Sequence, residues 1–143
     1  MRVSRSIVIS EWNDAIRRKI VDFWQERRVV FTVSEGRTLE GKRGSLLGNM
    51  TSFDMTRLIT TLTVSRTSPA EIVCRLDIDT TFQSITTWNE AYWQLEMDTF
   101  ESWLLYGEDK KAEWEAYYKT ARAGDIRWLL SFGLFGNRTP PER

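Results

Sequence analysis

Apolar residues divide the first part of the chain into a strand and a helix. Val3 to Ile9 alternates weakly between apolar and polar side chains, which predicts a strand. Ser10 can cap a helix that we expect to run to about Arg27. The apolar residues that predict this helix recur at helical spacing: Trp12, Ile16, Ile20 and Phe23. Its remaining positions are largely charged, which is typical of a surface helix packed on a sheet.

The next stretch is rich in β-branched residues and then in glycine. Val29 to Val33 predicts a second strand, and Glu35-Gly36 predicts a turn into a third strand from Arg37 to about Lys42. Between Leu39 and Asn49 we expect a bulge, a bend or a loop rather than a straight strand. The residues that interrupt the pattern there are Gly41, Gly44 and Gly48.

Clear alternation in the middle of the chain predicts a β-hairpin. Its strands run from Arg57 to Ser65 and from Glu71 to Thr80, joined by a turn at Thr67 to Ala70. The residues expected on the buried face are Leu58, Thr60, Leu62 and Val64 in the first strand and Ile72, Cys74, Leu76 and Ile78 in the second. Cys74 is therefore predicted to be a core thiol rather than a nucleophile.

The C-terminal part of the chain has helical spacing. A capping box at Thr87 predicts a helix that runs to about Tyr106 and stops at Gly107. A second helix is expected to begin at Glu108-Asp109 and to end before Gly124. Asp125 is then expected to cap a last short helix, and residues 137–143 to form a frayed tail.

The order of strand, helix, several strands and then helices predicts a single α+β domain over residues 1–136. We expect an antiparallel sheet of four to five strands with the helices packed on one face.

The predicted helix after Thr87 carries a wide apolar arc that contains two polar residues. At about 100° per residue the arc falls into two sectors, with Asn89 and Glu96 between them. The sectors consist of Trp88, Tyr92, Leu95, Trp103 and Tyr106 on one side and of Trp93, Met97, Phe100 and Leu104 on the other.

Burying an unpaired carboxylate is costly, so three environments for Glu96 have to be weighed. In the first case, Glu96 forms a salt bridge with an arginine such as Arg57 or Arg75, or a hydrogen bond with a threonine or tyrosine. Alternatively, one sector faces the sheet and the other faces a helix, and Glu96 emerges in the groove between them. In the third case Glu96 and Asn89 are the polar groups of a ligand pocket. Its apolar walls are then Trp93, Phe100 and Trp103.

Composition excludes several kinds of chemistry. Histidine is absent, which removes Ser-His-Asp and Cys-His nucleophile pairs, histidine bases and the common zinc ligand sets. Lys plus Arg equals Asp plus Glu at 20 each, so no net field draws the chain to nucleic acid. The single cysteine and the lack of a secretory signal indicate the cytoplasm. No apolar run approaches the roughly 18 residues of a membrane span, and no motif indicates a cofactor.

Two short motifs place groups that can bind ions close together in the sequence. Gly41 to Ser45 offers backbone amides and two cations to a phosphate, but it departs from the P-loop pattern, and we expect a solvated hairpin tip. Asp77-Ile78-Asp79 places two carboxylates on one strand face, as a hard cation requires. Arg75 beside them favours local charge balance over a metal site.

The apolar stretch from Trp128 to Phe135 has to be covered by the domain itself, by a partner chain or second copy, or by a membrane surface. We expect a non-enzymatic binding domain that acts by protein contact or self-association through its aromatic C-terminal helices. The residues expected to contact the partner are Trp128, Leu129, Phe132, Leu134 and Phe135. The alternative is a carrier of a small apolar ligand, or a carboxylate-dependent enzyme, with its pocket around Glu96.

Overall fold

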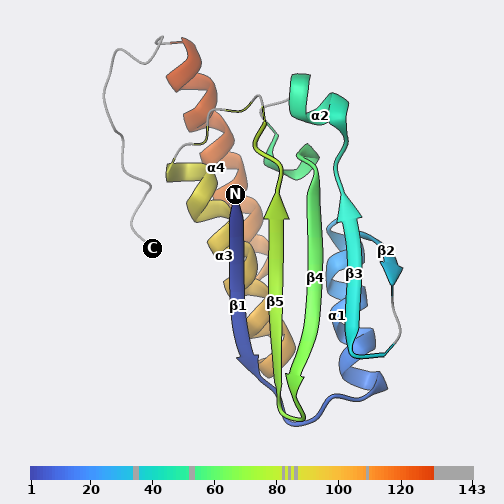
Figure 1. Ribbon diagram of the computed structural model, residues 1–143. Helices are drawn as coiled ribbons and strands as arrows, with labels where there is room; N and C mark the ends of the chain where they lie inside the picture. The colour runs from blue at the N-terminus through green and yellow to red at the C-terminus, as the bar shows by residue number, and fades with distance from the viewer. Residues whose placement is uncertain are drawn as a thin grey trace.

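The structure, a computed structural model, contains a five-stranded antiparallel sheet with helices packed against it (Figure 1), which confirms the predicted α+β class. It describes residues 1–33, 36–51, 54–81, 83, 85, 87–108 and 110–130, and side chains up to Thr120 except that of Thr51. The elements are β1 (Arg2–Val8), α1 (Asp14–Glu26), β2 (Val30–Val33), β3 (Thr38–Arg43), α2 (Leu46–Thr51), a 3₁₀ turn (Met55–Arg57), β4 (Thr60–Ser68), β5 (Glu71–Ile78), α3 (Thr87–Tyr106) and α4 (Lys111–Leu130).

The strands lie in the order β1-β5-β4-β3-β2, and every neighbouring pair is antiparallel. β4 and β5 form the predicted hairpin, and their register runs from Thr60 opposite Ile78 to Ser68 opposite Glu71. β1 pairs with β5, so the first strand lies beside the last one. The chain therefore crosses the sheet through α1 to reach β2 at the other edge (Figure 1).

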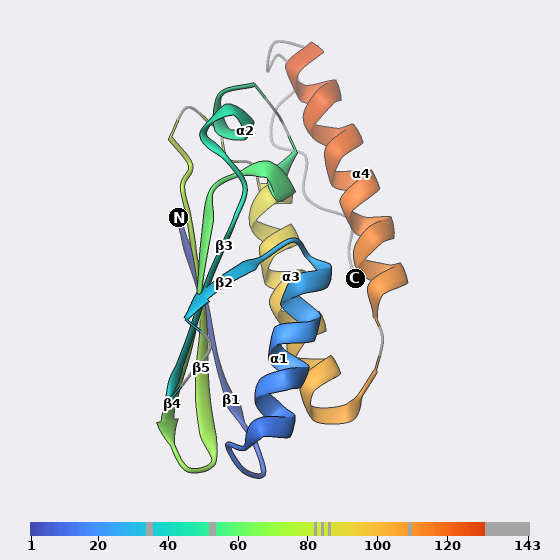
Figure 2. The same cartoon turned by 90° about the vertical axis from the view of Figure 1, so that its right-hand side faces the viewer.

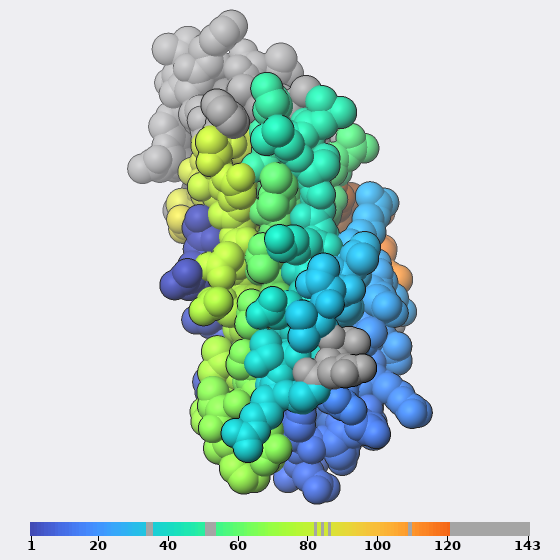
Figure 3. Space-filling view, turned by 45° about the vertical axis from the view of Figure 1, so that its right-hand side comes forward, coloured from blue at the N-terminus to red at the C-terminus, as the bar shows by residue number. Residues whose placement is uncertain are grey.

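The molecule has three layers, with the sheet, then α1 and α3, and then α4 on the outer side of α3 (Figure 2). The inward residues predicted for β4 and β5 are buried, which confirms the alternation. The opposite face of the sheet lies at the molecular surface (Figure 3). Hydroxyl and charged side chains occupy this face: Ser4, Ser6, Glu40, Thr61, Thr63, Arg75 and Asp77.

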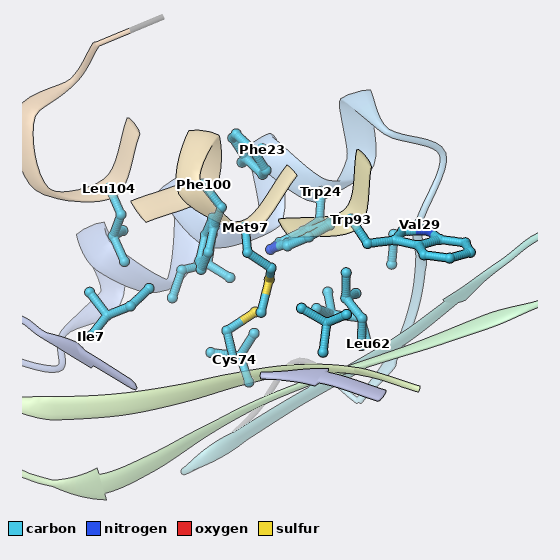
Figure 4. Close-up of a cluster of buried hydrophobic side chains, with 14 of the residues drawn as sticks. Ile7, Phe23, Trp24, Val29, Leu62, Cys74, Trp93, Met97, Phe100 and Leu104 are labelled. Atoms are coloured by element: carbon cyan, nitrogen blue, oxygen red, sulfur yellow. The ribbon is translucent and has the colours of Figure 1, made fainter. Parts of the chain in front are cut away.

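Aromatic residues of α1 and α3 fill the core above the sheet (Figure 4). Phe100 packs against both Phe23 and Trp24, with ring centroids 5.1 and 5.3 Å apart. Burial of each such side chain contributes roughly 1.5–3 kcal/mol relative to leaving it exposed. Cys74 lies beneath them with no exposed surface, and burial together with the charge of Glu96 raises its thiol pKa. The prediction of a core thiol is confirmed.

The ends of two helices differ from the prediction. α1 begins at Asp14, not after Ser10, because Asn13 is the cap and its side-chain oxygen accepts a hydrogen bond from the amide of Ile16 at 3.0 Å. The predicted break at Gly124 and the separate short helix after it are wrong, since α4 is continuous to Leu130. A glycine inside a helix costs only about 1 kcal/mol relative to alanine, and the neighbouring alanines favour helix.

The end of α3 agrees with the prediction. Gly107 has a φ of 68° and its amide donates to the carbonyl of Trp103 at 3.0 Å, which closes the helix with a left-handed residue.

The glycine-rich segment is more regular than predicted. β3 keeps its register with β4 as far as Arg43, so the predicted solvated hairpin tip is wrong. Gly41 allows β2 to approach closely, because a Cβ there would lie 2.5 Å from Cγ1 of Val29. The bend predicted in this segment comes at Gly44, whose φ is 82° and whose Cβ would lie 2.1 Å from the carbonyl oxygen of Leu58.

Candidate functional site

The two apolar sectors of α3 face different layers of the molecule. Trp93, Met97 and Phe100 point toward the sheet and α1 (Figure 4). Tyr92, from the other sector, packs against α4. Its ring centroid lies 5.6 Å from that of Trp114 and 5.7 Å from that of Tyr118. The apolar arc is therefore divided between the sheet and a neighbouring helix, as one of the three interpretations predicted.

Glu96, between the sectors, does not emerge in a groove but is completely buried in a salt bridge. Nη1 of Arg43 lies 2.6 Å from its Oε1 and Nη2 lies 2.7 Å from its Oε2, a bidentate pair. A salt bridge to an arginine was one of the interpretations, but the arginine is neither Arg57 nor Arg75. Arg57 lies near Asp54 at 3.7 Å, and Arg75 pairs with Asp77 at 2.8 Å on the opposite face of the sheet.

Strand alternation places Arg43 beneath α3. Leu39, Gly41 and Arg43 are the buried positions of β3, and only 4% of Arg43 is exposed. Burial alone lowers the pKa of the Arg43 guanidinium, but the charge and hydrogen bonds of Glu96 raise it above its ordinary value. Burial, followed by the charge of Glu96, raises the pKa of the neighbouring Tyr92 hydroxyl. Glu96 therefore holds Arg43 in its charged form inside the core.

The residues predicted to line a ligand pocket lie in two environments. Trp93, Glu96 and Phe100 have no exposed surface, and Asn89 is 5% exposed. Trp103 is partly buried and lines a groove that α3 forms with α1. A ligand site around Glu96 stays a prediction. The groove in the structure lies at Trp103.

This groove lies between α1, α3 and the segment that leads into α4, and its volume is about 60 Å³. Its lining residues are Asp22, Phe23, Glu26, Arg27, Thr99, Trp103, Glu108 and Lys110. Arg27, which the sequence marked only as the end of a helix, is 8% exposed and contributes a buried cation to the groove. Nothing in the local sequence distinguishes Arg27 from the exposed Arg28 that follows it, because the cap geometry decides which of them turns inward.

The guanidinium of Arg27 is bound by a carbonyl and aromatic rings. Nη1 donates to the carbonyl oxygen of Phe23 at 3.1 Å, and Cζ lies 3.5 Å from the Phe23 ring centroid and 5.1 Å from that of Trp114. Its Nε is buried without a hydrogen bond. No carboxylate in the described part of the chain forms an ion pair with it.

The pKa of Arg27 is shifted in the opposite direction from that of Arg43. Burial lowers the pKa of Arg27, and the attraction of Glu96, Tyr92 and Glu26 does not compensate for it. Such a cation gains more from an added acceptor than an arginine that already has a carboxylate.

The residues predicted to contact a partner fall at the end of α4. Trp128 and Leu129 belong to α4, where the structure describes the backbone alone, and Phe132, Leu134 and Phe135 lie outside the described residues. α2 lies at the same end of the molecule as the C-terminal turns of α4 (Figures 1 and 2). It exposes three apolar side chains that the sequence did not single out: Leu46 at 60%, Leu47 at 70% and Met50 at 62%.

Two further predictions concern ions and membranes. Asp77 pairs with Arg75, which is the predicted charge balance, and also with Arg2 at 2.6 Å. Within the described ranges no cluster of three or more histidine, cysteine, aspartate or glutamate side chains is placed to hold a metal ion. None of the helices, over the residues described, combines the length and apolar character needed to cross a bilayer.

The chain matches no family model, no curated protein and no solved structure.

Proposed function

We propose that this protein acts by protein–protein contact with a second copy of the same chain. The contact surface is the end of the molecule that carries α2 and the C-terminal turns of α4, which we call the α2 end. The observation that carries the proposal is the exposure of Leu46, Leu47 and Met50, each at 60% or more, on one short helix. Contiguous exposed apolar side chains are typical of interfaces, because covering them removes apolar surface from water.

The charge pattern supports a second copy as the partner. A two-fold contact places the same surface patch opposite itself, so a charged patch would repel its copy. α2 has the sequence LLGNMT and contains no charged residue. The formal net charge of the whole chain is zero, so no long-range repulsion opposes the approach of two copies.

The position of α4 also supports this surface. The aromatic residues in its first half, including Trp114 and Tyr118, are used against Tyr92 of α3. Beyond them α4 extends past the beginning of α3 at the α2 end (Figure 2). The helical period places position 128 within about 20° of position 117 around the axis. Position 128 is a tryptophan in the sequence, and tryptophan is a common interface anchor.

Sedimentation velocity at increasing protein concentration tests the proposal. We expect the unmodified chain to form a dimer, and a variant with Leu46→Ser, Leu47→Ser and Met50→Ser to stay monomeric with an unchanged circular dichroism spectrum. The matched control replaces exposed valines elsewhere, Val8→Ser and Val30→Ser, which are 73% and 71% exposed. This control should dimerise like the unmodified chain. A monomeric unmodified chain at the highest concentration, or equal loss of dimer in the control, contradicts the proposal.

A further inference from the structure

Two residues that line the groove beside Trp103 carry buried hydrogen-bond donors without acceptors. Arg27 Nε and Trp103 Nε1 are both buried and have no hydrogen-bond partner, and both residues line the groove. Buried donors that lack an acceptor cost free energy, so they are usually satisfied, and those that are not call for a specific explanation. The explanation that fits both is an acceptor group that enters the groove when a ligand is bound.

The charge of Arg27 specifies what kind of acceptor this is. The guanidinium has a backbone carbonyl at 3.1 Å and aromatic rings around it, but no carboxylate of the described chain in an ion pair. Among the described residues, the hydrogen bonds of the Glu96 oxygens come from Arg43, and Glu96 forms no ion pair with Arg27. A planar guanidinium in this condition is suited to a carboxylate, which accepts its N–H groups in a geometry that a neutral acceptor does not match.

The exposed rim of the groove has the opposite charge. Asp22, Glu26 and Glu108 line it and are exposed, whereas Lys110 is the one cation that accompanies Arg27 in the described lining. The Lys110 ammonium lies 3.7 Å from Glu108, and Lys111 lies 3.7 Å from Glu26, so these pairs leave Asp22 in excess. A simple anion is attracted by the buried Arg27 and repelled by the acidic residues at the rim. A ligand with an anionic tip and a cationic group behind it is attracted by both.

We propose that this groove binds the carboxylate of a small zwitterion of the amino-acid type, with Arg27 and Trp103 donating to the carboxylate and the acidic rim receiving the ammonium group. The groove volume of about 60 Å³ suits this ligand. It is well below the roughly 150 Å³ of a cavity that admits benzene, so a carboxylate fits it better than an aromatic ring. The inference does not depend on self-association, because the groove and the α2 end involve different residues.

Nuclear magnetic resonance titration of the full chain tests the site with defined probes. Glycine, β-alanine and γ-aminobutyrate vary the distance between the two charges, and acetate and methylammonium each present one of them. We expect at least one of the amino acids to shift the indole N–H signal of Trp103 with a dissociation constant on the order of millimolar, since ligands of so few atoms bind weakly. Acetate should bind several-fold more weakly than that amino acid, and methylammonium should not bind measurably.

Arg27→Met provides the decisive variant, because methionine keeps an apolar stem on Phe23 and removes the cation. It should weaken binding by about tenfold or more, the usual consequence of losing a charge-assisted hydrogen-bond pair. The matched control, Arg28→Gln, changes the exposed neighbouring arginine and should bind normally. Trp103→Phe, followed through backbone amide signals of α1, should bind several-fold more weakly and replaces Arg27→Met if that variant fails to fold.

Three outcomes overturn the proposal. They are the absence of any shift with all three amino acids at high concentration, binding of methylammonium as strong as that of the amino acids, and unchanged binding in both Arg27→Met and Trp103→Phe. Binding of acetate equal to that of every amino acid overturns the assignment to a zwitterion.

Discussion

Arg43 and Arg27 are both buried beside α3, yet their environments are opposite. Arg43 donates two hydrogen bonds to Glu96 at 2.6 and 2.7 Å, and its pKa is raised. Arg27 has a carbonyl and two aromatic rings around it, and burial lowers its pKa. Arg27 is 8% exposed and lines a groove, whereas Arg43 is 4% exposed and contacts a carboxylate. These differences separate a closed ion pair from a cation that can still accept a partner.

Glu96 connects the two regions electrostatically. It is the direct partner of Arg43, and it is also the largest attractive charge acting on Arg27. Arg43 in turn lowers the pKa of Arg27. Glu96 thus forms a bidentate pair with Arg43, whose Nε has no hydrogen bond, and attracts Arg27 without pairing with it. We therefore expect Glu96 to influence stability more than either arginine alone.

Replacing Glu96 should have the largest effect. Glu96→Gln leaves Arg43 buried without a carboxylate and removes the main attraction on Arg27, so we expect a loss of about 3–5 kcal/mol in the free energy of unfolding. Urea denaturation followed by tryptophan fluorescence measures it. Glu101→Gln is the control on the same helix, since Glu101 is partly exposed and its contact with Arg5 is 3.6 Å long. A loss below about 1 kcal/mol in Glu96→Gln would show that Arg43 does not need the carboxylate of Glu96 in the core.

Removing both charges of the pair should be much less harmful than removing one. For Arg43→Met combined with Glu96→Leu we expect an unfolding free energy within about 1–2 kcal/mol of the unmodified chain, because no unpaired charge remains in the core. The double-mutant cycle, with both single variants measured under the same conditions, gives the coupling energy. If the two single losses simply add, the residues do not act as a pair.

The sequence predicted part of the surroundings of the Arg43–Glu96 pair, which we call the closed region. The helical period of α3 was enough to place Glu96 inside an apolar arc, and the cost of a lone buried carboxylate was enough to include an arginine partner among three possible environments. Arg57 and Arg75 are the wrong partners, because Gly41 and Gly44 resemble strand breaks in the sequence and such breaks would exclude Arg43 from the sheet. The alternation of Leu39, Gly41 and Arg43 is the signal that identifies the partner, once Gly41 is understood as a place where β2 comes close.

The groove at Arg27, which we call the open region, could not be predicted from the sequence. The side chain of Arg27 turns inward because α1 ends there and the next residue, Arg28, adopts a φ of 65°. The groove also requires Trp103 and Lys110, which are distant in sequence and meet α1 only through the packing of α3 on it. Local patterns specify which face of an element is apolar, but not which polar side chains meet where three elements converge. The continuity of α4 through Gly124 was missed for a similar reason, because flanking residues outweighed one glycine.

Arg27→Met should change stability far less than Arg43→Met. The variant removes a cation that lacks a carboxylate and keeps an apolar stem against Phe23, so we expect the unfolding free energy to stay within about 1 kcal/mol of the unmodified value or to rise. Arg43→Met leaves Glu96 buried without an arginine and should lose several times more unfolding free energy. Both are measured by the same urea titration. An equal loss in the two variants would remove the distinction between the closed and the open region.

The smallest effect is expected at the exposed counterpart of these pairs, where Asp77 binds Arg2 at 2.6 Å and Arg75 at 2.8 Å. The hydrogen bond from Arg2, with smaller contributions from Arg75, holds the pKa of Asp77 below its ordinary value of 3.8. A carboxylate whose pKa is lower in the folded state stabilises the fold above its unfolded pKa and loses that contribution as the pH falls through the folded value. Asp77→Asn should therefore cost less than about 1 kcal/mol at pH 7, and the difference from the unmodified chain should disappear as the pH falls through the folded pKa of Asp77.

Salt separates this exposed pair from the buried one. At about 1 M salt the Debye length falls to about 3 Å, so the cost of Asp77→Asn should decrease, while that of Glu96→Gln should hardly change because solvent ions do not enter the core. Unfolding titrations of both variants at low and high salt measure this. If high salt reduced the Glu96→Gln cost in the same proportion, water and ions would have access to the Arg43–Glu96 pair. The closed region would then resemble the groove at Arg27 instead of contrasting with it.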